Sequence, residues 1–411
     1  MAASEDGGFR FLRLATRGYA AVDEVPERIE DGISTLASAI GFRAECTATA
    51  TSVLLSVSRG ERQSTEVIRT HQAGPDFARA VAFHRLLDRV RVGSLTPDEG
   101  ADRLQQLLAW RKEPSIVRTM LASGTLSASA ALLLRAQLSE FLLTFALGAL
   151  VGWSLIFVRR REHLAALAPV AMAALASALA FSAVRLGLDT VRPVATLIAA
   201  LVIFLPGWRM TVAMTELASG HWTSGAGRFL AAITTLLLLI VGVVVGQQAT
   251  SSVGAMALTP ATVLPAWVRV MAPLMAGVAL TYIFNARRRD MWWIALMCVI
   301  TSVASFLGGH WLGSTASAFV GAFTAMAVGA LLARRLNLPY PVLQQPATLM
   351  MVPGSLGFLS MGSLLDQNVT VAIQTGFQML FVALTLALGA MTAQVALRPL
   401  TRDRTREPSV P

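Results

Sequence analysis

The chain has 411 residues, of which 55% are hydrophobic and only 14% are charged, and its formal net charge is +10 at pH 7. Soluble domains are about one quarter charged, so this composition excludes a chain that is soluble throughout. The two cysteines, Cys46 and Cys298, lie far apart in sequence, which excludes a disulfide framework and a cysteine-based zinc site.

The first 114 residues are charged and mixed in character, and they predict a cytoplasmic α+β domain. Helical spacing covers 9–22 and 26–40, and a segment rich in Thr, Val and Ser follows at 43–71. That segment predicts two or three antiparallel strands with a tight turn at Gly60. A helix is expected at 77–92, and Thr96 to Glu99 predicts a capped start for a last helix that ends near Trp110.

From residue 115 onward the chain is a series of apolar segments. Most are 18 to 22 residues long in our reading, and about 20 residues are needed to cross a bilayer as a helix. The first is small and polar in character, so a short or interfacial helix remains an alternative there. We expect ten membrane spans, near 117–135, 139–158, 164–184, 192–209, 229–248, 266–285, 291–309, 312–333, 341–363 and 370–396.

The distribution of arginine predicts the orientation of these spans. With the N-terminal domain in the cytoplasm, fourteen arginines fall at cytoplasmic loops and span ends and only four at the outer ones. This is the bias of the positive-inside rule. We therefore expect a multi-pass protein of the bacterial inner membrane with both termini cytoplasmic. The arginines serve orientation in this interpretation, so nucleic acid is not an expected partner.

The membrane part contains a weak internal repeat. Pro353-Gly354 lies 147 positions after Pro206-Gly207, and each pair falls in the fourth span of a set of five. This predicts two repeats, at 115–250 and 251–397, followed by a cytoplasmic tail at 398–411. Because five is odd, the second repeat must be inverted relative to the first. Inverted repeats with helices interrupted by Gly or Pro are typical of secondary transporters, whose substrate site lies at the repeat interface.

Residues 205–228 carry the motif Pro206-Gly207, Thr211, Ala213, Glu216-Leu217, Gly220, Ser224-Gly225 and Arg228. This pattern resembles the motif of the threonine/serine exporter family, and the second Pro-Gly fits the carboxy-terminal half of that family. The resemblance covers most of the chain. It implies a soluble amino-terminal region, about ten spans in two related halves, and export of threonine or serine, which we expect to be driven by proton antiport with alternating access.

The motif also departs from the family. Val212 and Thr215 stand where a polar and a basic residue are expected, His221 replaces an Asp, and Arg209 is an addition. These changes leave the substrate open. A related branch, split over two chains, is associated with dicarboxylate export, so a dicarboxylate such as succinate is the alternative. A membrane-anchored sensor or scaffold that acts through the N-terminal domain is the alternative of a different class.

The expected site lies at the two broken helices, where backbone groups without helical partners need protein, water or ligand. Glu216 is the candidate for proton coupling, and Arg209 is a candidate for holding a substrate carboxylate. The full set for substrate binding is Pro206, Gly207, Arg209, Thr211, Thr215, Pro353, Gly354 and Ser355; the set for proton coupling is Glu216, His221 and Asp366.

Other polar residues have simpler interpretations. Glu140, Asp189 and Arg185 are expected at outer span ends, where they would form a surface ion pair. In the N-terminal domain, His71 and His84 lack metal-ligand spacing, and no glycine-rich phosphate loop follows a strand. We therefore expect no enzyme activity, no metal and no cofactor. The expected partners are a small polar metabolite, protons and the lipid bilayer, and a homo-oligomer is left open.

Overall fold

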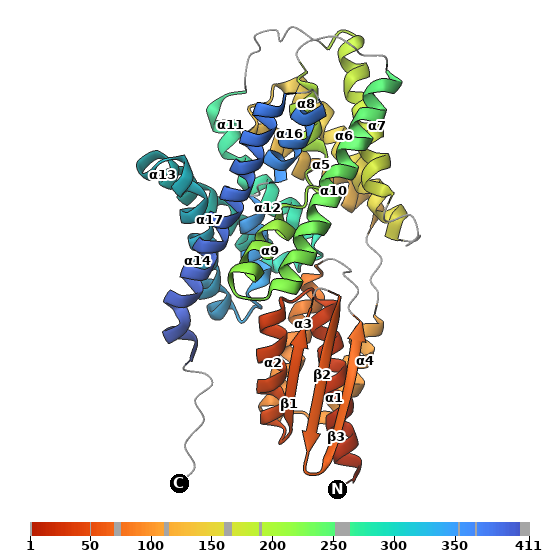
Figure 1. Ribbon diagram of the computed structural model, residues 1–411, viewed down its shortest axis with the longest axis vertical. Helices are drawn as coiled ribbons and strands as arrows, with labels where there is room; N and C mark the ends of the chain where they lie inside the picture. The colour runs from red at the N-terminus through yellow and green to blue at the C-terminus, as the bar shows by residue number, and fades with distance from the viewer. Residues whose placement is uncertain are drawn as a thin grey trace. The chain divides into compact units, whose positions relative to one another are not determined.

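The computed structural model describes residues 2–49, 51–69, 75–110, 115–159, 167–188, 191–250, 264–351, 354–365 and 368–402 (Figure 1). The chain divides into two compact units. The first contains Met1–Glu113 together with Gly220–Gly227 and Phe284–Arg287, and the second contains the rest. The N-terminal domain therefore includes two short segments that come from much later in the sequence.

The first unit is an α+β domain built on a three-stranded antiparallel sheet in the order β1-β2-β3. The predicted helices and strands of this region are confirmed. In chain order they are α1 (Ala2–Ala21), α2 (Pro26–Ala39), β1 (Arg43–Ala48), β2 (Ser52–Arg59), β3 (Arg62–Arg69), α3 (Phe77–Arg91) and α4 (Pro97–Ala109).

Local sequence signals explain these elements. Val53, Leu55 and Val57 alternate along β2 and are buried in the core with side chains of α1 and α2, because one face of a strand repeats every second residue. Gly60 has φ +60° in the two-residue turn that joins β2 to β3. Thr96 and Glu99 form the expected capping box at the start of α4.

Helix α1 begins seven residues earlier than predicted, at Ala2 instead of Phe9. The helix continues through Gly7 and Gly8, although glycine weakens a helix interior. In the structure Gly8 lies against the ring of Phe42, and a Cβ built at Gly8 would be 2.3 Å from that ring. The glycine permits close packing inside the helix and does not end it.

The segment at 284–287 is fastened to the N-terminus of α3 within the first unit. The backbone N–H groups of Phe77 and Ala78 donate to the carbonyl oxygens of Phe284 and Asn285, at 2.9 and 3.2 Å. The Asn285 side chain donates to Asp76 at 3.0 Å, while Asp76 also accepts from the backbone of α3. These bonds satisfy donors that a helix N-terminus otherwise leaves unpaired.

The second unit is helical. Its helices in chain order are α5 (Ile116–Leu133), α6 (Leu138–Arg159), α7 (Ala168–Arg185), α8 (Pro193–Ala200), α9 (Gly207–Ala218), α10 (Trp222–Ala249), α11 (Ala266–Val270), α12 (Ala272–Ile283), α13 (Met291–Leu312), α14 (Ser314–Leu336), α15 (Pro341–Leu349), α16 (Gly354–Leu365) and α17 (Val369–Arg402). Within the described residues, seven are long and apolar enough to cross a membrane: α5, α6, α7, α10, α13, α14 and α17.

Three of the ten predicted spans are not single helices of spanning length. The regions near 192–209, 266–285 and 341–363 are instead pairs of short helices, α8 with α9, α11 with α12, and α15 with α16. Each helix has 5 to 12 residues, and 12 residues rise only about 18 Å. Pro206 and Pro273 lie at two of the interruptions. Proline breaks a helix because it lacks an N–H and clashes with the preceding turn.

Helix boundaries recur at the spacing of the sequence repeat. Helix α9 begins at Gly207 and α16 at Gly354, and both run for 12 residues. The following helices, α10 and α17, begin at Trp222 and Val369, again 147 positions apart. The same interval therefore separates the starts of two successive helices in each half.

Close helix packing recurs at the same interval. A Cβ at Gly242 of α10 would lie 2.3 Å from the carbonyl oxygen of Val170 on α7. A Cβ at Gly389 of α17, 147 positions later, would lie 2.5 Å from the carbonyl oxygen of Phe319 on α14. Small residues allow the backbones of membrane helices to approach closely, so these glycines set the packing of α10 on α7 and of α17 on α14.

Candidate functional site

The first broken helix is held inside the second unit. Helix α8 ends at Ala200, residues 201–204 form a turn, and α9 begins after the buried Pro206. The hydroxyl of Ser127 on α5 donates to the carbonyl oxygen of Ala200 at 3.2 Å. A side chain from another helix thus satisfies one of the carbonyls that the break releases.

A buried ion pair follows this break. The Arg228 Nε lies 2.9 Å from a carboxylate oxygen of Glu216, and the two side chains are only 11% and 6% exposed. Glu216 is near the end of α9 and Arg228 is in the second turn of α10. An ion pair out of water costs desolvation energy, and natural proteins keep such pairs where charge has a role or where the geometry is good.

The sequence prediction missed this pairing because it placed Arg228 in a loop before the fifth span. The structure starts α10 at Trp222, seven residues earlier than the predicted span. Ser224, one turn before Arg228 on the same helix, is buried. The signal that could have found the pair is the motif itself, since Glu216 and Arg228 are its acidic and basic members.

The other predicted residues of this segment have different surroundings. The hydroxyls of Thr211 and Thr215 donate to carbonyl oxygens of their own helix, Gly207 at 3.1 Å and Thr211 at 3.0 Å. Arg209 is exposed. His221 belongs to the first unit, where its Nε2 lies 3.9 Å from a carboxylate oxygen of Glu30. The structure therefore brings together Glu216 and Arg228, and neither Arg209 nor His221 is placed with them.

The second broken helix is described only in part. Gly354 is buried at the start of α16 and Ser355 is half-buried, whereas Pro353 and Asp366 lie outside the described residues. Helix α16 contacts α9. Met210 of α9 and Phe358 of α16 belong to the same buried cluster. The helices that follow the two Pro-Gly pairs thus share one core.

The expected surface ion pair at the outer span ends is wrong for Glu140. Its side chain is buried and pairs with Arg192, at 2.8 Å from the Arg192 Nε. Glu140 also accepts the backbone N–H groups of Arg192 and Gln137. This pair joins the start of α6 to the start of α8, which explains its burial; Asp189 lies outside the described residues, and Arg185 donates to the Thr250 carbonyl.

The part of the chain that the structure describes contains no group of three His, Cys, Asp or Glu side chains that could hold a metal ion. Both cysteines are free thiols. Burial, reinforced by the charge of Glu30, raises the pKa of the Cys46 thiol to about 12. That thiol is therefore protonated and unreactive at neutral pH.

Comparison with known protein families shows the family to which this chain belongs. A family model described as "Putative threonine/serine exporter" matches residues 24–249, and a second model, described as "Threonine/Serine exporter, ThrE", matches residues 269–396. The chain belongs to the threonine/serine exporter family. The matches cover the first unit from residue 24 onward and both Pro-Gly pairs, as the motif at 205–228 indicated. No curated protein and no solved structure matched the chain.

Membership of the exporter family and the seven long apolar helices establish a multi-pass membrane protein. The family supports export of a small amino acid, and it is a family of transporters. The buried pair of Glu216 and Arg228 lies inside the first matched region.

Proposed function

We propose that this protein exports threonine or serine across the bacterial inner membrane in exchange for protons, by alternating access. The observation that carries the proposal is the buried ion pair between Glu216 and Arg228. Glu216 belongs to the second half of the broken helix α8–α9, and Arg228 belongs to the helix that follows it; a transporter of this kind would form its substrate site at such a broken helix. The termini are cytoplasmic in this proposal, as the arginine distribution favours.

A buried carboxylate beside a buried guanidinium matches the two charges of a zwitterionic amino acid. Arg228 would hold the substrate carboxylate through paired hydrogen bonds, and Glu216 would hold the ammonium group. Each charge of the protein would then exchange its partner for a charge of the substrate. Such an exchange avoids leaving an unpaired charge in a low-dielectric site, which would cost several kcal/mol.

The same pair supplies a mechanism for antiport. When Glu216 takes a proton from the outer side, it loses the negative charge that holds the ammonium group, and the substrate leaves. When it releases that proton to the cytoplasm, it can bind the next amino acid. Proton and substrate would therefore compete for one carboxylate, which is the condition for exchange of one for the other. Arg209 and His221 are not required for this step.

The alternating movement would come from the two halves of the second unit. In our proposal these are inverted repeats, with α9 and α16 as equivalent helices that meet at the centre. The recurring interval of 147 positions at the starts of α9 and α16, and of α10 and α17, supports this. The contact between α9 and α16 supports a site shared by the halves, to which Thr211, Thr215, Gly354 and Ser355 would contribute.

The same site also bears on the dicarboxylate alternative. A dicarboxylate needs two cationic groups and would be repelled by an ionised Glu216, whereas one cation and one anion suit an amino acid. The described environment of Glu216 therefore favours threonine or serine over succinate. A sensor or scaffold would have no need of a charge pair buried between two helices of the second unit.

Transport into vesicles tests the proposal. The purified full-length protein is reconstituted in liposomes, and uptake of labelled threonine, serine and succinate is measured with and without an imposed pH gradient. We expect gradient-dependent flux of threonine or serine and none of succinate. Flux of succinate alone, or amino-acid flux that ignores the pH gradient, would overturn the substrate or the coupling.

The variant Glu216→Gln separates coupling from binding. It removes the titrating group and keeps the size of the side chain, so we expect gradient-driven flux to fall at least 100-fold. Glu99→Gln is the control, since Glu99 serves only the cap of α4 in the soluble unit. Retention of proton-driven flux in correctly folded Glu216→Gln would show that another group carries the proton.

A further inference from the structure

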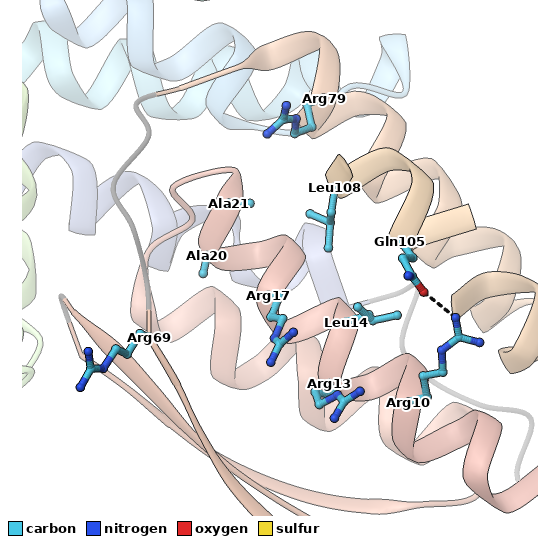
Figure 2. A pocket seen from close by; sticks show the side chains of 10 residues that line it. All are labelled: Arg10, Arg13, Leu14, Arg17, Ala20, Ala21, Arg69, Arg79, Gln105 and Leu108. Atoms are coloured by element: carbon cyan, nitrogen blue, oxygen red, sulfur yellow. Dashed lines mark hydrogen bonds between the residues drawn. The ribbon is translucent and has the colours of Figure 1, made fainter. Parts of the chain in front are cut away.

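The N-terminal domain contains a pocket lined by arginines, which has no part in the transport site. Its volume is about 520 Å³, within the usual range of roughly 300–1,000 Å³ for small-molecule sites. Figure 2 shows side chains from α1, β3, α3 and α4 around it. The lining residues are Arg10, Arg13, Leu14, Arg17, Ala20, Ala21, Arg69, Arg79, Gln105 and Leu108.

Three of the five arginines come from one face of α1. Arg10, Arg13 and Arg17 are spaced by three and four residues, so they lie one above the other along the helix (Figure 2). Like charges at this spacing destabilise a helix. A bound anion would relieve that repulsion, whereas a domain without a ligand gains nothing from it.

Two carboxylates balance only part of this charge. Glu66 lies 3.8 Å from Arg13 and 3.3 Å from Arg17, and Asp102 lies 2.8 Å from Arg10. Five guanidinium groups against two carboxylates leave an excess of three positive charges around one cavity. Among the described residues, neither Arg69 nor Arg79 has an acidic partner within ion-pair distance.

Arg79 provides an independent indication that the pocket binds a ligand. Its terminal nitrogen donates to the carbonyl oxygen of Trp110 at 2.7 Å, which fixes the side chain at the pocket. Its Nε is buried and has no hydrogen-bond partner among the described residues. Buried donors are nearly always paired in folded proteins, so a donor without a partner beside a cavity indicates a missing acceptor.

We propose that this pocket binds a phosphorylated small molecule with at least two negative charges and the size of a nucleotide. Guanidinium groups bind phosphate oxygens through paired hydrogen bonds, and three excess charges suit a polyphosphate better than a single carboxylate. Leu14, Leu108 and the two alanines offer an apolar surface for the uncharged part of the ligand. The concave shape favours a small molecule over a nucleic-acid strand.

The ligand would be a free metabolite of the cytoplasm, and its binding would give the soluble unit a sensing role beside transport. An anionic lipid headgroup has the same phosphate chemistry, so the test must separate the two sources. The inference rests on residues of the first unit alone. It stands or fails independently of the proposed exchange at Glu216 and Arg228.

Calorimetric titration of the full-length protein in detergent tests the site, with ATP, pyrophosphate and inorganic phosphate as probes. We expect saturable binding of ATP and pyrophosphate at one site per chain, and much weaker binding of inorganic phosphate. Affinity should fall as salt rises, because exposed charges are screened. Absence of saturable binding of both ATP and pyrophosphate would overturn the proposal.

Charge variants of opposite sign distinguish ligand binding from structural ion pairing. Arg17→Gln removes a positive charge from the pocket, and we expect at least tenfold weaker ATP binding. Glu66→Gln removes the carboxylate that Arg17 contacts, and we expect tighter binding. If the Arg17–Glu66 pair mattered only for folding, both variants would weaken binding. Arg17 and Glu66 are partly exposed, so neither change should unfold the domain.

Arg103→Gln is the matched control, because Arg103 is an exposed arginine of α4 that does not line the pocket. Equal loss of ATP binding in Arg103→Gln and Arg17→Gln would show nonspecific attraction and overturn the site. A soluble short-chain phosphatidic acid is titrated in parallel. Tighter binding of that lipid than of ATP would overturn the free metabolite as the source of the phosphate.

Discussion

Glu216 of α9 and Arg228 of α10 form an ion pair of 2.9 Å with both side chains almost fully buried. They are only twelve positions apart in sequence, and the turn between the two helices brings them together. The pair joins the acidic and basic members of the family motif in one contact. The motif at 205–228 therefore contains a broken helix and a buried ion pair.

Neutralising the pair tests whether its charges serve transport or folding. Glu216→Gln or Arg228→Gln alone breaks the buried pair, and we expect a loss of stability of about 3–5 kcal/mol. The double variant Glu216→Gln/Arg228→Gln removes both charges of the pair, so part of that stability should return. Transport should remain absent in the double variant, because neither the ammonium nor the carboxylate of the substrate would find its partner.

Thermal unfolding in detergent measures the stability of the three variants, and the vesicle assay measures their threonine or serine flux. Recovery of flux together with stability in the double variant would show that the pair is only structural. Arg209→Gln serves for comparison, since Arg209 is exposed and is not placed with Glu216. We expect that variant to keep its stability and its proton-dependent flux.

The glycines at the close helix contacts predict that alanine substitutions there lower the stability of the protein. Gly242→Ala would put a methyl group 2.3 Å from a backbone oxygen of α7, and Gly389→Ala would put one 2.5 Å from a backbone oxygen of α14. Backbone cannot move aside as a flexible side chain can, so each change should destabilise the protein by about 1–3 kcal/mol.

Gly227→Ala is the control on the same helix as Gly242. A Cβ at Gly227 meets nothing within 4 Å. Alanine has a better helix propensity than glycine, so this variant should be neutral or more stable by up to about 1 kcal/mol. Midpoints of thermal unfolding in detergent rank the three variants, and an unchanged midpoint in Gly242→Ala would contradict the packing of α10 on α7.

A buried acid predicts how the stability of the N-terminal domain depends on pH. Glu24 lies 3.2 Å from Arg28 and 3.4 Å from the Nε2 of His84. Burial by itself would raise the pKa of Glu24, but the hydrogen bonds and charges of His84 and Arg28 outweigh it and hold that pKa below its ordinary value of 4.5. The ionised form therefore stabilises the folded domain at neutral pH.

Since the folded pKa is lower than the unfolded one, this stabilisation is complete above the unfolded pKa and is lost as pH falls through the folded pKa. Hydrogen–deuterium exchange of α1 and α3 in the full-length protein should be roughly 100-fold faster in Glu24→Gln than in wild type at pH 7. That ratio should shrink below about pH 4.5. Glu27→Gln, at an exposed position of α2, should show no difference at either pH.

The sequence alone determined most of the N-terminal domain and the place of the broken helices. The capping box at Thr96 and the turn at Gly60 depend on residues within a few positions of each other, so their physics is local. Pro206 and Gly207 likewise act on the backbone where they stand. These features need no knowledge of the rest of the fold.

Tertiary structure decided which charges meet. Arg228 lies inside α10 and pairs with Glu216, Glu140 reaches Arg192 fifty-two positions later, and five arginines from three elements line one pocket. It also decided that the apolar region near 266–285, which has no Pro-Gly pair, is a pair of short helices. Burial and pairing depend on how distant segments pack, and a one-dimensional pattern of apolar and charged residues does not contain that information.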